Sequence, residues 1–254
     1  MSSNIAIAVQ ESYLTGQATY DLGAIHSIIN SSSVLHVSFS PEPSDPFPVI
    51  LPMIGVMGSF QYPSAGIDEP LDCYLHGYVS SRIMRLAKAS PQGLPICVAA
   101  TKVDGLVLAL TPNSHSYNYR SAVLHGYASL VESVEEKVWA MELITNSVVP
   151  NRWANSRIPP DGAEMQSTNV LRVKVVSGSG KIRDGGPHDE AKDTTREDVT
   201  ESTWIGVVPV VETFCQPVAS ATNKVGKVPE YIASYVAETN AKNEEYAQSA
   251  ARLP

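Results

Sequence analysis

A short polar stretch that follows a strand-like segment has the residue types of a phosphate site. It reads YLHGYVSSRIMRLA over residues 74–87 and contains His76, Ser80, Ser81 and Arg82. Apolar residues at helical spacing begin directly after the serines, so these side chains lie at a predicted helix start, where free backbone N–H groups and the helix dipole favour an anion. Two hydroxyls and a guanidinium add the directed donors that a phosphate needs. The alternative is a serine that only caps the helix and an arginine that faces solvent.

A second group of polar side chains lies at the entrance of a later predicted strand. The segment HSYNYRS covers residues 115–121, and apolar and polar residues alternate after it. This alternation places Tyr119 and Ser121 on one face of the strand and Arg120 on the other, with Asn118 at the strand entrance. Donors at such an entrance can converge on a flat ligand that is rich in nitrogen and oxygen. An ordinary polar strand end is the alternative interpretation.

Other familiar catalytic patterns do not occur in the sequence. The segment GSGKIRDGG, residues 178–186, lacks the spacing of a P-loop, and there is no G-x-S-x-G elbow for a nucleophilic serine. The histidines show no ligand spacing, so we predict no metal site. Cys73, Cys97 and Cys215 are far apart, which predicts buried, unpaired thiols without a disulfide framework.

Composition limits the classes of partner. The chain has 254 residues, 43% of them hydrophobic, 17% charged residues and a formal net charge of −8. It therefore has enough apolar residues for a core, and no general positive field that would attract nucleic acid or an anionic membrane. The sequence contains neither a leader pattern nor an apolar run of about 18 residues, the length that a membrane span needs. We expect a cytoplasmic protein.

Short strand-like runs dominate the first two-thirds of the chain, bounded by Pro, Gly, Ser or Asp. The predicted strands are Val34–Ser40, Val49–Met57, Cys73–Tyr78, Leu94–Lys102, Leu106–Leu110, Ala122–Val131, Val170–Val176 and Trp204–Val210. Asp104-Gly105 between two apolar runs predicts a tight hairpin turn. The pattern favours an antiparallel sheet that closes into a small barrel.

Helices are predicted between and after these strands. One follows Ser81, and a second begins at a capping box formed by Ser133 and Glu136 and ends before Pro150. The apolar face of the second consists of Val134, Val138, Met141, Thr145 and Val148. A third covers residues 229 to about 251. Residues 177–202 are expected to form a long polar loop. We predict an α+β, mainly β fold in a single domain, residues 1–254, with a core at 30–230 and a C-terminal helix and tail at 229–254.

Four separated motifs together resemble the pyridoxamine 5′-phosphate oxidase-like proteins. They are YLHGYVSSRIMRL, ICVAATKVDGLVLALTPNSHSYNYRSAVLHGYASLV, KIRDGGPHDE and WIGVVPV. The resemblance spans about residues 34–229 and is strongest to the flavin-nucleotide-binding branch related to the nitroimidazole-resistance reductases. It implies an FMN-binding split β-barrel that forms a homodimer, with FMN at the subunit interface.

The resemblance also implies roles for individual residues. The cofactor-binding residues would be Pro52, Met53, Ile54, His76, Ser80, Ser81, Arg82, Asn118, Tyr119, Arg120, Ser121 and Trp204. Of these, the first three would offer backbone hydrogen bonds to the flavin ring, and Trp204 would come from the partner subunit. His115 and Arg183 would line the open face of the flavin, with His115 as the candidate catalytic acid and Arg183 as a substrate contact. Relatives often have Lys where this chain has Arg82, and Arg keeps the charge.

The predicted function is an FMN-dependent oxidoreductase that acts on a small organic molecule. In such an enzyme the flavin supplies the electron-transfer chemistry and the protein positions it. NADH or NADPH is a candidate electron donor. The alternatives are a protein that binds flavin or haem without turnover, and a redox-neutral enzyme that has reused the flavin groove. The arginine-rich pyridoxal-phosphate signature of the vitamin-forming oxidases is not evident, so we do not predict that substrate.

Overall fold

The computed structural model of the chain describes residues 18–42 and 45–252. Contacts divide the chain into two compact units. The first unit comprises residues 1–101 and 121–181, and the second comprises residues 102–120 and 182–254. The boundaries fall within long strands rather than at a linker, and the single domain of residues 1–254 stays a prediction.

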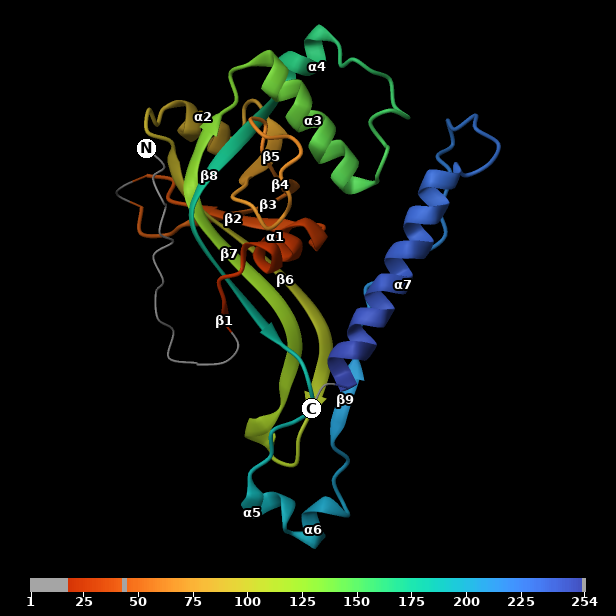
Figure 1. Cartoon of the computed structure of the whole chain (residues 1–254). Helices are drawn as coiled ribbons and strands as arrows, with labels where there is room; N and C mark the ends of the chain where they lie inside the picture. The colour runs from red at the N-terminus through yellow and green to blue at the C-terminus, as the bar shows by residue number, and fades with distance from the viewer. Residues whose placement is uncertain (1–17, 43–44, 253–254) are drawn as a thin grey trace. The chain divides into compact units, whose positions relative to one another are not determined.

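A sheet of antiparallel pairs forms the framework (Figure 1). Its main path runs in the order β3-β2-β6-β7-β8-β5-β4, with β1 added to β8 and β9 added to β6. The strands are β1 Ala18–Thr19, β2 Leu35–Phe39, β3 Val49–Met53, β4 Gly55–Gly58, β5 Asp72–Tyr78, β6 Leu94–Leu108, β7 Ser116–Leu130, β8 Thr168–Arg183 and β9 Gly206–Pro209. Side chains alternate across β2, where Leu35 and Val37 are buried and His36 is exposed. This period-two pattern explains why most strands could be predicted.

The predicted hairpin turn at Asp104-Gly105 is wrong. Strand β6 continues through both residues, and residues 105–108 pair with β9. Asp104 is buried because it pairs with an arginine of β7, and a β-carbon on Gly105 would lie 2.8 Å from Val207 Cγ1. The glycine therefore permits close approach of β9 instead of making a turn. The chain reverses farther on, at residues 109–115, which include the short 3₁₀ helix η1 Pro112–Ser114.

Helix α1, Leu22–Ser31, lies in a segment for which we predicted no helix. Asp21 is its N-cap, and the carboxylate accepts a hydrogen bond of 2.8 Å from the backbone N–H of Ala24. Ile25, Ile28 and Ile29 are buried on one face. An Asp followed by isoleucines at helical spacing was the signal that could have found this helix.

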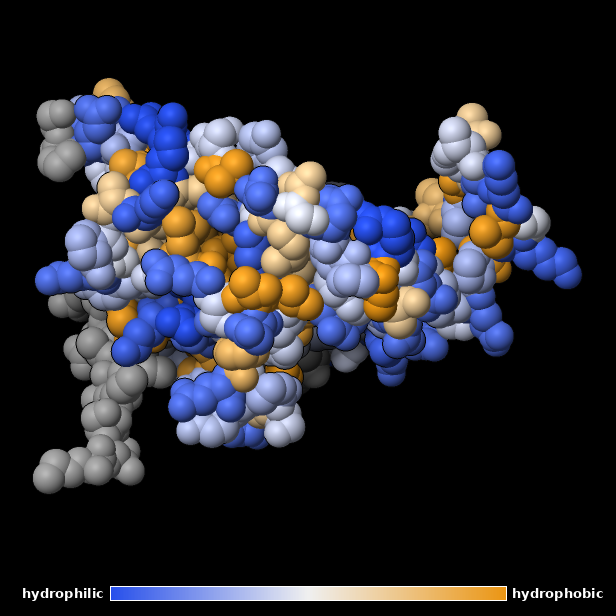
Figure 2. Space-filling model, turned by 90° about the horizontal axis from the view of Figure 1, so that it is seen from above, coloured by the Kyte–Doolittle hydropathy of each residue, from blue (hydrophilic) through white to orange (hydrophobic). Residues whose placement is uncertain are grey.

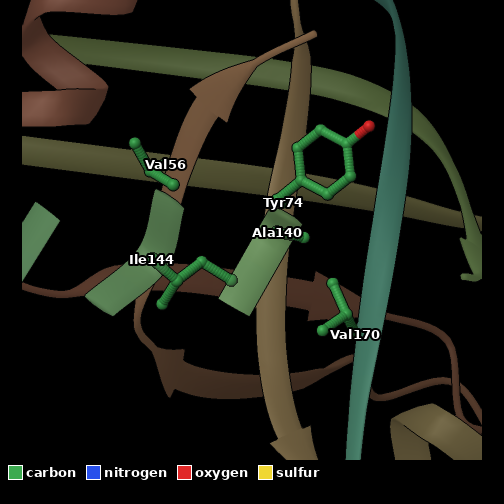
Figure 3. Packing of buried hydrophobic residues seen from close by; sticks show 5 residues of the cluster. All are labelled: Val56, Tyr74, Ala140, Ile144 and Val170. Atoms are coloured by element: carbon green, nitrogen blue, oxygen red, sulfur yellow. The ribbon is translucent and has the colours of Figure 1, made fainter. Parts of the chain in front are cut away.

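Helix α2, Arg82–Lys88, and helix α3, Val134–Val148, form where helices were predicted. Ser133 caps α3, and the predicted apolar face is correct in its middle, where Met141 packs against the core cluster, but wrong at its ends. Val134 and Val148 are 62% and 51% exposed, whereas Ala140 and Ile144 are buried. These two pack against strands β4, β5 and β8 in the cluster drawn in Figure 3, which consists of Val56, Tyr74, Ala140, Ile144 and Val170. Trp139, Met141 and Leu143 also pack against this cluster, so the face of α3 toward the sheet is broader than the predicted one.

The predicted capping box of α3 is only half formed. Ser133 Oγ accepts from the backbone N–H of Glu136, but the Glu136 carboxylate is buried and turned to the sheet. It accepts hydrogen bonds from the Tyr74 hydroxyl at 2.9 Å and from Arg172 at 3.1 Å. Burial, together with this hydrogen bond to Glu136, raises the pKa of Tyr74. The carboxylate thus anchors α3 to strands β5 and β8.

His26 of α1 makes the stability of the first unit sensitive to acid. Its ring is 2% exposed, and Nδ1–H donates to the carbonyl of Ile67 at 2.6 Å. Burial lowers the pKa of His26 below its ordinary value of 6.5. Because the folded protein disfavours the charged ring, the stability contributed by neutral His26 is present above pH 6.5 and is lost as the pH falls below it toward the lowered pKa.

We therefore expect the free energy of unfolding to fall more steeply between pH 7 and pH 5 in the natural protein than in His26→Gln. Urea unfolding at several pH values would measure this slope. His36→Gln is the matched control, because His36 is exposed on β2. Equal slopes for His26→Gln and the natural protein would contradict the prediction.

The three cysteines are unpaired but differ in exposure. Cys73 is buried, and burial, with a contribution from Asp72, raises the pKa of its thiol to about 12. Cys97 is half-buried and Cys215 is exposed, so the prediction of buried thiols is correct only for Cys73. Burial of this kind leaves the Cys73 thiol protonated and unreactive.

The second unit contains the turn between β6 and β7, strand β9 and three helices. Helices α5, Ala191–Thr194, and α6, Glu197–Thr200, lie in the segment predicted as a polar loop, whose first residues also belong to β8. Helix α7, Glu230–Arg252, confirms the predicted C-terminal helix. A further short helix, α4 Gly162–Ser167, belongs to the first unit. None of the helices in the described ranges combines the length and apolar character that crossing a bilayer requires.

Apolar side chains also reach the surface. The face shown in Figure 2 has patches of hydrophobic residues between hydrophilic ones. In the second unit, Trp204, Leu106 and Val208 are 65%, 38% and 44% exposed. Leu106 and Val208 are direct partners in the β6–β9 ladder, so they lie on the same face of it. Exposed apolar groups on one face are typical of interaction surfaces.

Candidate functional site

The turn between β5 and α2 holds an unsatisfied hydroxyl. Ser81 is the N-cap of α2 by its backbone angles, with φ −62° and ψ 150°, but its side chain makes no capping hydrogen bond. Its Oγ is buried and has no hydrogen-bond partner, the only such side-chain atom found among residues 18–42 and 45–252. Backbone bonds from Ser81 N–H to Tyr78 O at 2.9 Å and from Val79 N–H to Ser167 O at 3.0 Å define the turn. A buried donor without an acceptor fits a site whose ligand supplies that acceptor.

Arg82 follows Ser81 at the first position of α2. Its side chain is 44% exposed, and Nη2 lies 3.6 Å from Oε1 of Glu42, whose side chain is 65% exposed. Such an exposed pair contributes little and is readily exchanged for another anion. Ser80 is exposed in the same turn. The serines and Arg82 therefore offer two hydroxyls and a guanidinium to an anion.

Strands β3 and β5 bring further predicted residues together. The backbone N–H of His76 donates to the carbonyl of Ile54 at 3.5 Å. Gly77 leaves a narrow space, because a β-carbon there would lie 3.1 Å from Met84 Cε of α2 and 3.7 Å from Met53 Cε of β3. The fold thus gathers the ends of β3 and β5 around α2. Pro52 on β3 and His76 on β5 are both exposed residues. Partial desolvation of the imidazole still lowers the pKa of His76.

Ser121 is the residue of the NYRS motif that belongs to the first unit. Its hydroxyl donates to the carbonyl of Lys181 on β8 at 3.3 Å. Tyr119 is half-buried and belongs to the second unit. The common face of β7 that the alternation assigns to both residues stays a prediction.

Asn118 and Arg120 have internal partners. Asn118 is fully buried, accepts a hydrogen bond from Arg183 and donates to the carbonyls of Gly185 and Ala250. Arg120 forms a bidentate ion pair with Asp104, with distances of 2.9 and 2.7 Å. Flavin binding by Asn118 and Arg120, and substrate binding by Arg183, stay predictions. Each side chain would have to give up its internal partner or bind the ligand in addition to it.

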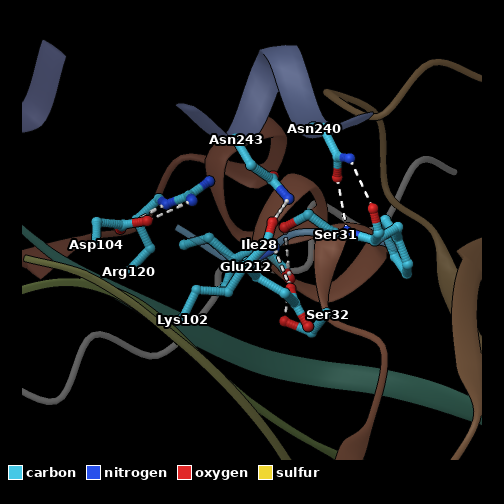
Figure 4. A network of polar contacts seen from close by, with 10 residues as sticks. Ile28, Ser31, Ser32, Lys102, Asp104, Arg120, Glu212, Asn240 and Asn243 are labelled. Carbon is cyan, nitrogen blue, oxygen red and sulfur yellow. Dashed lines mark hydrogen bonds and ion pairs between the residues drawn. The ribbon is translucent and has the colours of Figure 1, made fainter. Parts of the chain in front are cut away.

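The ring of Tyr246 covers Arg120, with its centroid 3.5 Å from the guanidinium carbon (Figure 4 shows the Arg120–Asp104 pair). Tyr246 and Asp104 were not among the predicted site residues. The Asp-Gly pair was interpreted as a turn, which hid the role of Asp104 as an ion-pair partner. No sequence pattern indicated the role of Tyr246, because its contact with Arg120 joins segments that are far apart in the sequence.

His115 has one ring nitrogen in use. Its Nδ1 accepts the backbone N–H of Ala109 at 2.9 Å, so in the neutral ring the proton is on Nε2. The side chain is exposed. The neutral ring therefore presents Nε2–H as a hydrogen-bond donor, whereas a general acid would be the doubly protonated ring, in which Nδ1 could not accept from Ala109. The role of His115 as an acid stays a prediction.

Trp204 also reaches the surface, and its ring lies over Gly206. A β-carbon on Gly206 would lie 2.8 Å from Trp204 Cη2.

The predicted site residues are divided between the two units. Pro52, Met53, Ile54, His76, Ser80, Ser81, Arg82 and Ser121 belong to the first, and His115, Asn118, Tyr119, Arg120, Arg183 and Trp204 to the second.

The architecture is a mainly antiparallel split β-barrel with peripheral helices, as predicted. A family model described as pyridoxamine 5′-phosphate oxidase matches residues 21–182, more than half of the chain. The chain therefore belongs to the pyridoxamine 5′-phosphate oxidase family. No curated protein matches it at a significant level.

Solved structures share the fold over most of the chain. The flavocytochrome Anf3 from Azotobacter vinelandii is 24% identical with a TM-score of 0.70, and the match covers 86% of this chain and 92% of that one. An FAD and haem binding protein from Mycobacterium smegmatis is 22% identical with a TM-score of 0.71, covering 87% and 98%. A candidate 5-nitroimidazole antibiotic resistance protein from Bacteroides thetaiotaomicron is 20% identical with a TM-score of 0.48, covering 69% and 94%.

Proposed function

We propose that the protein is an FMN-dependent oxidoreductase that acts on a small organic molecule. The observation that carries the proposal is the buried hydroxyl of Ser81, which lacks a hydrogen-bond partner and directly precedes the exposed Arg82 at the start of α2. A flavin phosphate would supply the missing acceptor and accept from Arg82 as well. Membership of the pyridoxamine 5′-phosphate oxidase family supports a flavin as that ligand. When bound, the flavin would transfer hydride or electrons.

The remaining predicted residues would orient the flavin and the molecule it acts on. Backbone groups near Met53 and Ile54, on the segment next to His76, would bind the polar edge of the ring. Tyr119 and Ser121, which the alternation assigns to one face of β7, would contact the ring or the ribityl chain. Because Nδ1 of His115 accepts the Ala109 N–H, its Nε2–H would donate a hydrogen bond to the substrate.

A homodimer completes the proposal. Trp204, Leu106 and Val208 are exposed apolar residues of the second unit, and two of them are paired on one face of the β6–β9 ladder. A second copy of the chain that covered them would remove this apolar surface from water. In that arrangement, Trp204 would approach the cofactor of the partner.

A second candidate function is a protein that holds both a flavin and haem. Two matched structures are a flavocytochrome and an FAD and haem binding protein, and each match covers more than four-fifths of this chain. Under this second candidate function, the bound flavin would be FAD instead of FMN. This candidate also makes electron transfer between two bound groups the alternative to reaction with a small molecule.

The absorption spectrum of the purified protein, followed by mass identification of the released cofactor, tests these proposals. Absorption at about 450 nm indicates a flavin, and a strong Soret band indicates haem. Titration with FMN and with FAD would distinguish the two flavins. Anaerobic bleaching by NADH or NADPH would support reductase activity with that donor. If the protein is colourless once free flavin has been removed after both titrations, flavin binding is refuted.

A further inference from the structure

Arg183 is a buried cation whose partners are neutral. The residue is 8% exposed, and its guanidinium donates to Asn118 Oδ1 and, at 3.0 Å, to the carbonyl of Gly186. In the part of the chain that the structure describes, Arg183 forms no ion pair with a carboxylate. Buried charges in proteins are usually paired. The positive charge of Arg183 is therefore available to an anion.

Two N–H donors next to Arg183 converge on one oxygen atom. The backbone N–H of Gly185 donates to the carbonyl of Ala250 at 2.7 Å, and Asn118 Nδ2 donates to the same oxygen at 3.2 Å. Ala250 lies in the last turn of α7, where helix carbonyls carry partial negative charge. Donors that converge in this way bind oxyanions in other proteins. Here the oxygen they bind belongs to the chain itself.

The rest of α7 is attached by polar contacts and by an apolar contact between Tyr235 and Phe214, whose ring centroids lie 5.7 Å apart. The Asn240 amide accepts from Phe214 N–H at 2.7 Å and donates to Phe214 O at 2.9 Å, and Asn243 donates to Glu212 O at 2.8 Å (Figure 4). Among the 23 residues of the helix, only Ala247 and Ala250 are buried. The buried side chains near the end of the helix are therefore two small alanines, and hydrogen bonds that can be exchanged with water contribute little net stability, so the last turn is a segment that can open locally.

We propose that Gly185 N–H, the Asn118 amide and Arg183 form an anion-binding site that the last turn of α7 occupies when no ligand is bound. A ligand with a carboxylate or phosphate group would take the place of the Ala250 carbonyl and release this turn. Release that extended to the preceding turn would also uncover Arg120, because Tyr246, four residues before Ala250, lies over its guanidinium. Helix α7 is then a built-in competitor for an anionic ligand. The inference goes beyond the proposed function and does not depend on flavin binding.

The charges around the cluster agree with a site for one anion. Asp104 neutralises Arg120 through the bidentate pair. Burial raises the pKa of Tyr246, Arg120 lowers it, and Asp104 and Asp184 raise it, so Tyr246 stays neutral between the charged groups. Asp184 is exposed and forms no ion pair with Arg183 among the described residues. One buried positive charge is thus left for the ligand.

Hydrogen exchange on the full chain tests the proposal. Inorganic phosphate or acetate should speed amide exchange in residues 246–252 by about fivefold or more, the lower end of typical coupling between sites. Sodium chloride at equal ionic strength should leave this exchange rate unchanged. A response to phosphate alone or to acetate alone identifies which oxyanion the site takes. Unchanged or slower exchange with both anions would overturn the proposal.

Variants locate the response. Arg183→Gln should abolish it, whereas Arg82→Ala should retain it, which separates this site from the proposed flavin phosphate site. Asn240→Ala loosens α7 away from the cluster, so it should raise the affinity for the anion by about fivefold because more of the protein is competent to bind. Ser249→Ala, at an exposed position in the last turn, is the matched control. If Arg183→Gln does not fold, an unchanged anion affinity in Asn240→Ala still refutes the proposal that the last turn of α7 competes with the anion.

Discussion

Replacement of Arg82 by alanine is expected to weaken FMN binding by about 1–3 kcal/mol, or roughly 5- to 150-fold, the contribution of a charge-assisted hydrogen bond. Arg82 is the first residue of α2 and follows Ser81, whose buried hydroxyl has no partner, and in the proposed site a phosphate would accept from both side chains. Its present partner, Glu42, is largely exposed and does not fix it in place. Fluorescence titration of FMN would measure the change.

Arg85→Ala is the matched control for this prediction. It removes the same charge from the same helix, at an exposed position in the last turn. Ser81→Ala offers a second test, in which stability and FMN affinity are expected to change in different directions. The substitution removes a buried hydroxyl that has no partner, so it should leave the unliganded protein equally or more stable while it weakens FMN binding. If Arg82→Ala and Arg85→Ala bind FMN equally well, the phosphate lies elsewhere.

Gly126→Ala is expected to destabilise the first unit by about 2–4 kcal/mol. Gly126 is buried in β7, and a β-carbon there would lie 2.4 Å from the carbonyl oxygen of Lys174 and 2.9 Å from Val173 Cγ1. The obstacle includes backbone of the neighbouring strand β8, which cannot move aside as the end of a flexible side chain could. Strands β7 and β8 would therefore have to separate locally. Urea unfolding followed by circular dichroism would measure the loss.

Gly162→Ala serves as the comparison for this loss. Gly162 is the first residue of α4, and nothing lies within 4 Å of the position that its β-carbon would take. Alanine there should be neutral or should stabilise by up to about 1 kcal/mol, because it favours the helix. Equal stability of the two variants would show that β7 and β8 do not approach as closely as the structure places them.

Local patterns in the sequence predicted a large part of the fold and one half of the candidate site. The alternation in β2, the Ser133 cap of α3 and the helix at 230–252 all depend on neighbours within a few residues. The same holds for the start of α2, where Ser81 and Arg82 follow the end of a strand. Capping, periodicity and turn preferences act over short distances along the chain, so they can be recognised without the tertiary structure.

The Asp104-Gly105 pair shows where local patterns fail. Asp-Gly favours a turn in isolation, but Arg120 neutralises Asp104 and strand β9 packs over Gly105, so the strand continues. Burial of Glu136 on α3 is a similar case. Its charge is accommodated by Tyr74 and Arg172, which lie 62 and 36 residues away in the sequence.

The roles of the polar residues at 118–120 were decided by tertiary contacts. The sequence indicated that Asn118 and Arg120 stand at a strand entrance rich in donors, and it placed Arg183 in a separate motif. Only the folded chain shows that Asn118 joins Arg183 to Ala250, across separations of 65 and 132 residues. No local preference encodes such contacts, because a buried hydrogen bond is selected by the three-dimensional arrangement of its donors and acceptors.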